Sequence, residues 1–149
     1  MNEESEKNDE LRYACAVGDL EVARSLLRVA NPASKDSDAL RWASKNGHTS
    51  IVELLLKDGR ADPSACKSMC LRCACAEGHV EVVKRLLEDK RADPRDEDFF
   101  CIGIVARNGN SEIARLLLDD DRVGRLQGHQ SAGFEVGQRP DEGLGGCSD

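Results

Sequence analysis

A stretch of 25 residues occurs twice in this chain, and a period of 31 residues relates the two copies. The stretch from Ala39 to Pro63 matches the stretch from Cys70 to Pro94 at 13 of 25 positions. A further step of 31 residues reaches a third copy at 101–124, and a step of 29 residues backward reaches a shorter copy that begins at Leu11. A fixed period of this length is typical of solenoids, in which equivalent supersecondary units stack side by side.

Each copy has the pattern of two short helices joined by a glycine turn. One column of the repeat is glycine in every copy, at Gly18, Gly47, Gly78 and Gly109. Apolar residues recur before this glycine at i and i+3, and after it at i, i+1, i+4 and i+5, which are helical spacings. Helices this short are unstable alone in water, so neighbouring units must bury each other's apolar faces. The sequence therefore predicts an all-α solenoid of four helix-turn-helix repeats.

The repeats divide the chain into three regions. An acidic segment at 1–10 is expected to precede the first helix, and the four repeats then cover about 11–38, 39–69, 70–100 and 101–123. Residues 124–149 are rich in glycine and poor in apolar residues, and we expect them to be disordered. The alternative for this tail is that Phe134 and Val136 fold back over the last repeat.

One column of the repeat holds the largest side chains. Tyr13, Trp42, Cys73 and Ile104 occupy it, one residue before the small buried residue of the first helix. We expect this column to belong to the core between repeats. A tryptophan that stacks on a ligand is the alternative for Trp42.

Charge and hydropathy exclude several classes of protein. The net charge is -7, with no basic stripe that could follow a nucleic-acid backbone. No apolar run approaches the length of a membrane span, and the acidic first ten residues do not resemble a signal peptide. An odd count of seven cysteines argues against a fully paired disulfide framework. We therefore expect an intracellular monomer, cytoplasmic or nuclear, that binds neither nucleic acid nor membrane.

Metal and catalytic sites also find little support. Cys66, Cys70, Cys73 and Cys75 include one CxxC spacing, but no second pair follows as in a zinc ribbon. The repeat register explains three of these cysteines as small packing residues. His48 and His79 are repeat-column residues beside turn glycines, and His129 lies in the tail, so no nucleophile has an evident base. We expect no enzyme activity, catalytic residue, metal or cofactor.

The repeats resemble ankyrin repeats. The resemblance covers about three quarters of the chain and depends on the motif from Gly78 to Leu87, on Gly47-His48 with Leu54 to Leu56, and on the Ala-Asp steps at Ala61 and Ala92. The Thr-Pro-Leu-His start of the family's first helix is missing, since Arg12, Arg41, Arg72 and Gly103 stand where histidine is usual. The loops are also shorter, so stunted hairpins are expected.

The resemblance implies a function and a surface. Ankyrin stacks bind partner proteins on a concave face lined by the first helices and the loop tips. Carried over to this chain, that face comprises the pairs before each turn glycine together with loop residues. The candidate partner-binding residues are Lys45, Asn46, Lys67, Glu77, Arg95, Phe99, Arg107 and Asn108.

Three functional hypotheses follow. The first is an adaptor that binds a partner protein of unknown identity and has no catalytic activity. The second is a metal- or redox-responsive module that uses Cys66, Cys70 and Cys73. The third is a passive remnant of a longer repeat array.

Overall fold

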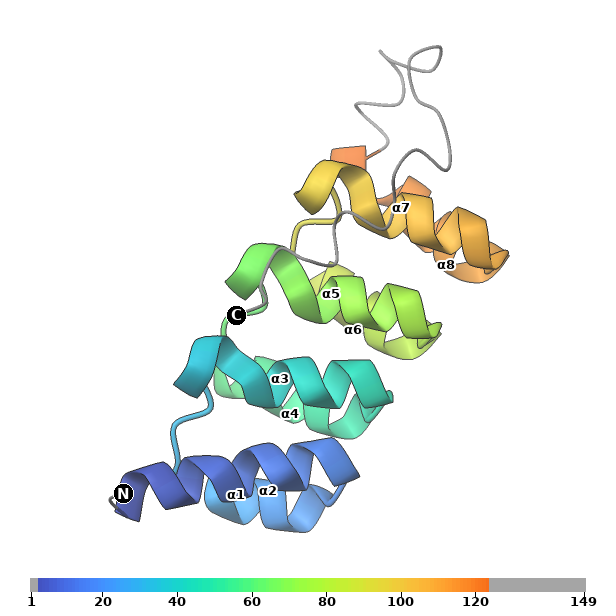
Figure 1. The fold of residues 1–149 in the computed structure, drawn as a ribbon. Helices are drawn as coiled ribbons and strands as arrows, with labels where there is room; N and C mark the ends of the chain where they lie inside the picture. Colours follow the sequence, from blue (N-terminus) through green and yellow to red (C-terminus); the bar gives the residue numbers. More distant parts are fainter. Residues whose placement is uncertain (1–2, 124–149) are drawn as a thin grey trace.

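The computed structural model describes residues 3–123, and these residues form eight α-helices and no strand (Figure 1). In chain order the helices are α1 (Glu3–Val17), α2 (Leu20–Leu26), α3 (Ser34–Asn46), α4 (Thr49–Asp58), α5 (Ala65–Glu77), α6 (Val80–Asp89), α7 (Asp96–Asn108) and α8 (Ser111–Asp119). The predicted all-α solenoid of four helix-turn-helix repeats is confirmed. The proposed disorder of the tail, and the folding back of Phe134 and Val136, lie outside the described residues.

The helices form two parallel rows, because each repeat contributes one helix to each row. The first helices of the repeats, α1, α3, α5 and α7, form what we term the inner row, and α2, α4, α6 and α8 form the outer row (Figure 1). Each helix contacts its partner in the repeat and the equivalent helices of the neighbouring repeats. None of the described helices combines the length and the apolar character that a membrane span requires.

The acidic segment is part of the first helix rather than a region before it. Helix α1 begins at Glu3 and continues without interruption to Val17. Glutamate and lysine are good helix formers, and the acidic side chains of the first turn interact favourably with the positive end of the helix dipole. Lys7 and Glu10 add an ion pair of 3.2 Å at i and i+3. The structure differs here from the expected division after residue 10, because these residues form the first turns of α1 itself.

The glycine turns bring neighbouring repeats into close contact. Gly47 ends α3 with φ +78, a left-handed conformation that glycine adopts at little cost. A Cβ atom at Gly47 would lie only 2.6 Å from Nδ1 of His79 in the next repeat. The Nε2 of His79 donates a hydrogen bond of 2.8 Å to the carbonyl oxygen of Lys45. His48 makes the equivalent bond of 3.0 Å to Ala16 in the first repeat. Position 47 therefore requires glycine for two reasons: the backbone is left-handed, and a larger residue would collide with the ring of His79.

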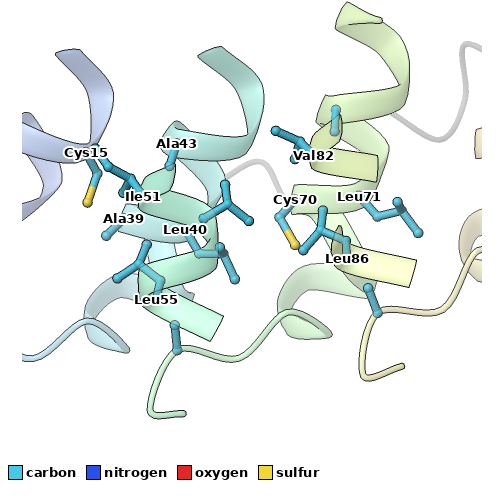
Figure 2. Close-up of a cluster of buried hydrophobic side chains, with 14 of the residues drawn as sticks. Cys15, Ala39, Leu40, Ala43, Ile51, Leu55, Cys70, Leu71, Val82 and Leu86 are labelled. Atoms are coloured by element: carbon cyan, nitrogen blue, oxygen red, sulfur yellow. The ribbon is translucent and has the colours of Figure 1, made fainter. Parts of the chain in front are cut away.

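The core is a continuous column of small and aliphatic side chains that runs through the stack. Figure 2 shows this column at the second and third repeats, where the side chains of the inner helices meet those of the outer helices. Leu40, Leu55, Leu71 and Leu86 are completely buried there. Burial of each such side chain stabilises the fold by about 1.5–3 kcal/mol. Cys15, Cys70 and Cys75 share this apolar environment, so the register correctly predicts them as packing residues.

The starts of α3 and α5 contain a left-handed turn, and no hairpin joins the repeats within residues 3–123. Lys35, Asp36 and Ser37 all have φ between 54 and 60, and the equivalent residues Cys66, Lys67 and Ser68 repeat this conformation. Each turn places a serine hydroxyl beneath the following repeat, where it accepts a hydrogen bond from a backbone N–H. The two bonds join Ser37 to Asp62 at 2.7 Å and Ser68 to Asp93 at 2.8 Å. These bonds offset part of the cost of left-handed backbone in non-glycine residues.

Arginines at the ends of the outer helices tie each repeat to the one before it. Arg60 donates to the carbonyl oxygen of Leu27 at 2.7 Å, and Arg122 donates to that of Ala92 at 2.7 Å. Arg91, the equivalent residue between them, donates to the carbonyl oxygen of Ala61 at 3.2 Å. A carboxylate two residues earlier orients each guanidinium, and the hydrogen bond from Arg60 lowers the pKa of Asp58 below its usual value. The first repeat lost two residues in this region and has no such arginine.

Gly47 and Gly59 provide a matched test of the close contact between repeats. Both have left-handed backbone, at φ +78 and φ +88, but nothing lies within 4 Å of a Cβ atom at Gly59. We expect Gly59→Ala to cost about 1–2 kcal/mol of unfolding free energy, from backbone strain alone. Gly47→Ala should cost about 1–3 kcal/mol more, because the methyl group collides with His79. Urea denaturation followed by circular dichroism measures both, and equal losses would contradict the steric role of Gly47.

Candidate functional site

The resemblance to ankyrin stacks implies that the inner row lies on the concave side. Neighbouring inner helices contact each other much more extensively than neighbouring outer helices do. We use the term concave face for the solvent-accessible side chains of α1, α3, α5 and α7.

Trp42 is the centre of this face. Its side chain is half-buried, and its Nε1 donates a hydrogen bond of 3.1 Å to Oδ2 of Asp38 one turn earlier. Two cations lie over the indole ring, with the guanidinium of Arg41 at 5.0 Å and Nζ of Lys45 at 5.5 Å from its centroid. Hydrogen bonding and cation–π contacts together fix the ring in one orientation.

The column that holds Trp42 is not the core between repeats. Tyr13 is 70% exposed, and Trp42, Cys73 and Ile104 are half-buried. The prediction of a core column is therefore wrong. Helical periodicity places this position beside the buried small residue, at the edge of the apolar face, where a side chain contacts the core on one side and solvent on the other.

Asp38 is the residue on which the order of this region depends. Its carboxylate is largely buried and accepts hydrogen bonds from Trp42, from Nη1 of Arg12 at 3.3 Å and from Nε of Arg41 at 2.7 Å. The sequence pattern did not single it out, because the equivalent positions, Asp9, Met69 and Phe100, share no common type of side chain. Its place one helical turn before the tryptophan is the signal that could have identified it.

The predicted residues before the turn glycines lie on the concave face. Asn46, Glu77, Arg107 and Asn108 are exposed, and Lys45 is half-buried against the indole ring. Two of them also hold repeats together, since Asn46 donates to the carbonyl oxygen of Ala16 at 2.8 Å and Asn108 to that of Ala76 at 3.3 Å. Of the remaining members of this set, Glu77 and Arg107 are exposed to solvent, and Lys45 lies over the indole ring.

The predicted loop residues lie near the starts of the inner helices, and contacts within the protein leave their side chains less free to bind a partner. Nζ of Lys67 forms an ion pair of 3.0 Å with Glu97, and Arg95 pairs with Asp93 at 3.0 Å. The hydrogen bond from Arg95 lowers the pKa of the Asp93 carboxyl. Phe99 is half-buried in the left-handed turn, at φ +63, and does not project as an exposed aromatic anchor. The structure thus separates these loop residues from the group around Trp42.

A buried arginine occupies the third repeat at the position where the family has histidine. Arg72 is completely buried, and its guanidinium donates to the carbonyl oxygens of Lys67 at 3.1 Å and Cys66 at 2.8 Å. It also lies 5.8 Å from the centroid of the buried Phe100 ring. These contacts stabilise the left-handed turn, so Arg72 has a structural role and is not a surface group for a partner.

The cysteines within the described part of the chain show no arrangement for a metal site. No group of three or more His, Cys, Asp or Glu residues within 3–123 is arranged to hold a metal ion. Cys70 and Cys75 are buried, and burial raises the pKa of each thiol well above its usual value. Burial likewise raises the pKa of Cys15 to about 12. Thiols in this environment favour the protonated form, which is a poor metal ligand.

Removal of the Asp38 carboxylate should release the tryptophan. In Asp38→Ala, Trp42 loses its hydrogen-bond acceptor, so its fluorescence should shift to longer wavelengths and acrylamide should quench it more strongly. Trp42 is the single tryptophan of the chain, so the signal is specific. Glu81→Ala, an exposed change on α6, is the control. Identical spectra for wild type and Asp38→Ala would show that Asp38 does not hold the ring.

The buried thiols should resist alkylation in the folded protein. An ordinary cysteine, with a pKa of about 8.5, is mostly thiolate at pH 9 and reacts readily with iodoacetamide. Because the pKa of Cys15 is raised to about 12, it stays protonated at this pH as well as shielded. Peptide mapping by mass spectrometry should find Cys15, Cys70 and Cys75 labelled in urea but not in buffer. Half-buried Cys73 serves as the internal comparison. Rapid labelling of Cys15 in buffer would contradict its core position.

The comparison with known families agrees with this architecture. The family model for ankyrin repeats, containing three copies, matches residues 11–98, which is more than half of the chain. No curated protein sequence is significantly similar to the chain. The match begins at the first residue of the first repeat, and the matched region has the helix pairs and glycine turns described above. The chain therefore belongs to the ankyrin-repeat family.

Proposed function

We propose that this protein is a non-catalytic adaptor that binds a partner protein through the concave face, with Trp42 as the anchor. Ankyrin repeats are in general protein–protein interaction modules. The finer assignment depends on one observation, a half-exposed tryptophan held in place by Asp38 on the inner row. An ordered aromatic side chain loses little conformational entropy on binding, and tryptophan is the residue most enriched at interface hot spots.

The charges around Trp42 indicate what a partner should present. Arg41 and Lys45 lie over the indole ring, and Arg107 is exposed further along the inner row. A partner segment with an apolar side chain for the ring and carboxylates for these cations would complement the surface. Asn46, Glu77 and Asn108 complete the proposed contact area, and Lys67, Arg95 and Phe99 belong to its margin.

The other hypotheses have less support. A metal- or redox-responsive module would use Cys66, Cys70 and Cys73, and burial raises the pKa of Cys70 and of Cys73, which disfavours the reactive thiolate at both. A passive remnant would have no reason to retain an ordered tryptophan with a polar network on its surface. We place the adaptor inside the cell, in the cytoplasm or nucleus, as the composition suggests.

A charge-reversal pair with a matched control tests the proposal. Lys45→Glu with Arg107→Glu changes the concave face, and Lys84→Glu with Arg115→Glu makes the same change in charge on exposed positions of the outer row. Proteins captured from a cell lysate by the wild type should also be captured by the outer-row variant. The concave-face variant should lose them, with a Kd at least about tenfold weaker, or about 1.4 kcal/mol, in calorimetry with a purified partner. Equal captures by both variants would overturn the assignment of the face.

A further inference from the structure

The outer side of the first repeat has a groove lined by apolar side chains. Tyr13, Val17 and Val22 are 70%, 52% and 43% exposed, and they line a depression of about 350 Å³ together with Ala14 and Leu26, with the charged residues Lys7, Glu10 and Asp19 also in its lining. A terminal repeat normally needs a polar outer face to keep the stack soluble. We term this surface, on α1 and α2 at one end of the stack in Figure 1, the N-face.

Two residues of the N-face, Val22 and Leu26, correspond to positions that are buried between repeats elsewhere, whereas the equivalents of Tyr13 are half-buried and those of Val17 are exposed. Val22 is equivalent to Ile51, Val82 and Ile113, which are at most 1% exposed. Leu26 is equivalent to Leu55, Leu86 and Leu117, which are fully buried. These positions are covered in every repeat that has a neighbour before it. The N-face is therefore one half of the interface that joins ankyrin repeats inside this chain.

The opposite end of the stack presents the other half of the same interface. Leu27 and Ala23 of the first repeat are buried, whereas their equivalents in the fourth repeat, Leu118 and Ala114, are exposed and half-buried. Cys15 is likewise buried, and its equivalent Ala106 is exposed. No residue within 3–123 covers this surface, which we term the C-face. It lies on α7 and α8, at the far end of the described stack from the N-face (Figure 1).

We propose that the C-face of one molecule binds the N-face of a second copy, so that the solenoid continues from one chain into the next. The occupant is a second copy because this chain itself exposes the matching surface. The two surfaces are equivalent to the pairs that already fit each other at the three internal junctions. Such a contact joins two different surfaces and does not close on itself, so it produces open chains of molecules. This differs from the monomer expected from the sequence.

The association should be weaker than the internal junctions. The three internal junctions are held by Arg60, Arg91 and Arg122, which donate hydrogen bonds to carbonyl oxygens of the preceding repeat. The first repeat has no equivalent arginine, so a contact at its N-face would lack these bonds. Two separate molecules also lose translational and rotational freedom when they associate. Repeats of one chain avoid this cost, because the connecting loops already hold them together. Assembly should therefore depend on concentration.

Two variants that each disable one face provide the test. Val22→Glu places a charge on the N-face, and Leu118→Glu places one on the C-face; both residues are exposed, so the fold should tolerate the changes. Ser25→Glu, at an exposed position of α2, is the control. Circular dichroism should show the same melting temperature for all four proteins. Sedimentation equilibrium then measures the mean mass as the concentration is raised.

The expected pattern is specific for a head-to-tail contact. Wild type and Ser25→Glu should increase in mass without a plateau at the dimer, and each face variant alone should remain monomeric. An equimolar mixture of the two face variants should form dimers and nothing larger, because it contains one intact pair of faces. A wild type that stays monomeric at every concentration would overturn the proposal. So would a dimer that Val22→Glu abolishes and Leu118→Glu leaves intact, since that would be a symmetric contact between two N-faces.

Discussion

Packing between neighbouring helix pairs carries most of the burial in this molecule, because a single pair of short helices cannot hide its apolar faces. The leucine and alanine columns repeat at each junction, and Leu40, Leu71 and Leu86 are buried by residues from more than one repeat. Close approach requires small side chains and glycine at the turns, which explains a composition with only 3% aromatic residues. The same requirement fixes the backbone of every repeat, so differences between repeats are confined to the edges of the helices.

Those edges are where the polar network of the concave face is built. Asp38 accepts hydrogen bonds from Arg12, Arg41 and Trp42, and so connects the first and second repeats across their junction. One carboxylate thereby stabilises the stack and orders the proposed contact surface. Asn46 and Asn108 likewise belong to the proposed surface and also join neighbouring repeats.

The sequence predicts the parts of the fold that depend on periodicity. The glycine column, the leucine columns and the role of Cys15 and Cys75 follow from spacing, because these positions recur at helical intervals in the repeats. Periodicity cannot tell an edge position from a core position, which is why Trp42 was assigned to the core. It also has no information on loop conformation, so the left-handed turn that half-buries Phe99 could not be predicted. The residues predicted before the turns lie on the inner row, and their role in binding stays a prediction; the contacts between Asp38 and Trp42 required the structure.

The fourth repeat has Asn110 at the position of His48 and His79, and this difference affects where the stack begins to unfold. His48 and His79 bind the carbonyl oxygen of the preceding repeat, whereas Asn110 uses its side chain to accept from the N–H of Ile113 at the start of its own helix α8. On the turn side of this junction Asn108 reaches back at 3.3 Å, while Arg122 holds the opposite side by its bond to Ala92. In a linear array with nearest-neighbour coupling, opening begins at a terminal unit whose junction is weakly held. The fourth repeat should therefore detach and rejoin most often, so that amide hydrogens of α7 and α8 exchange with solvent before those of the two middle repeats.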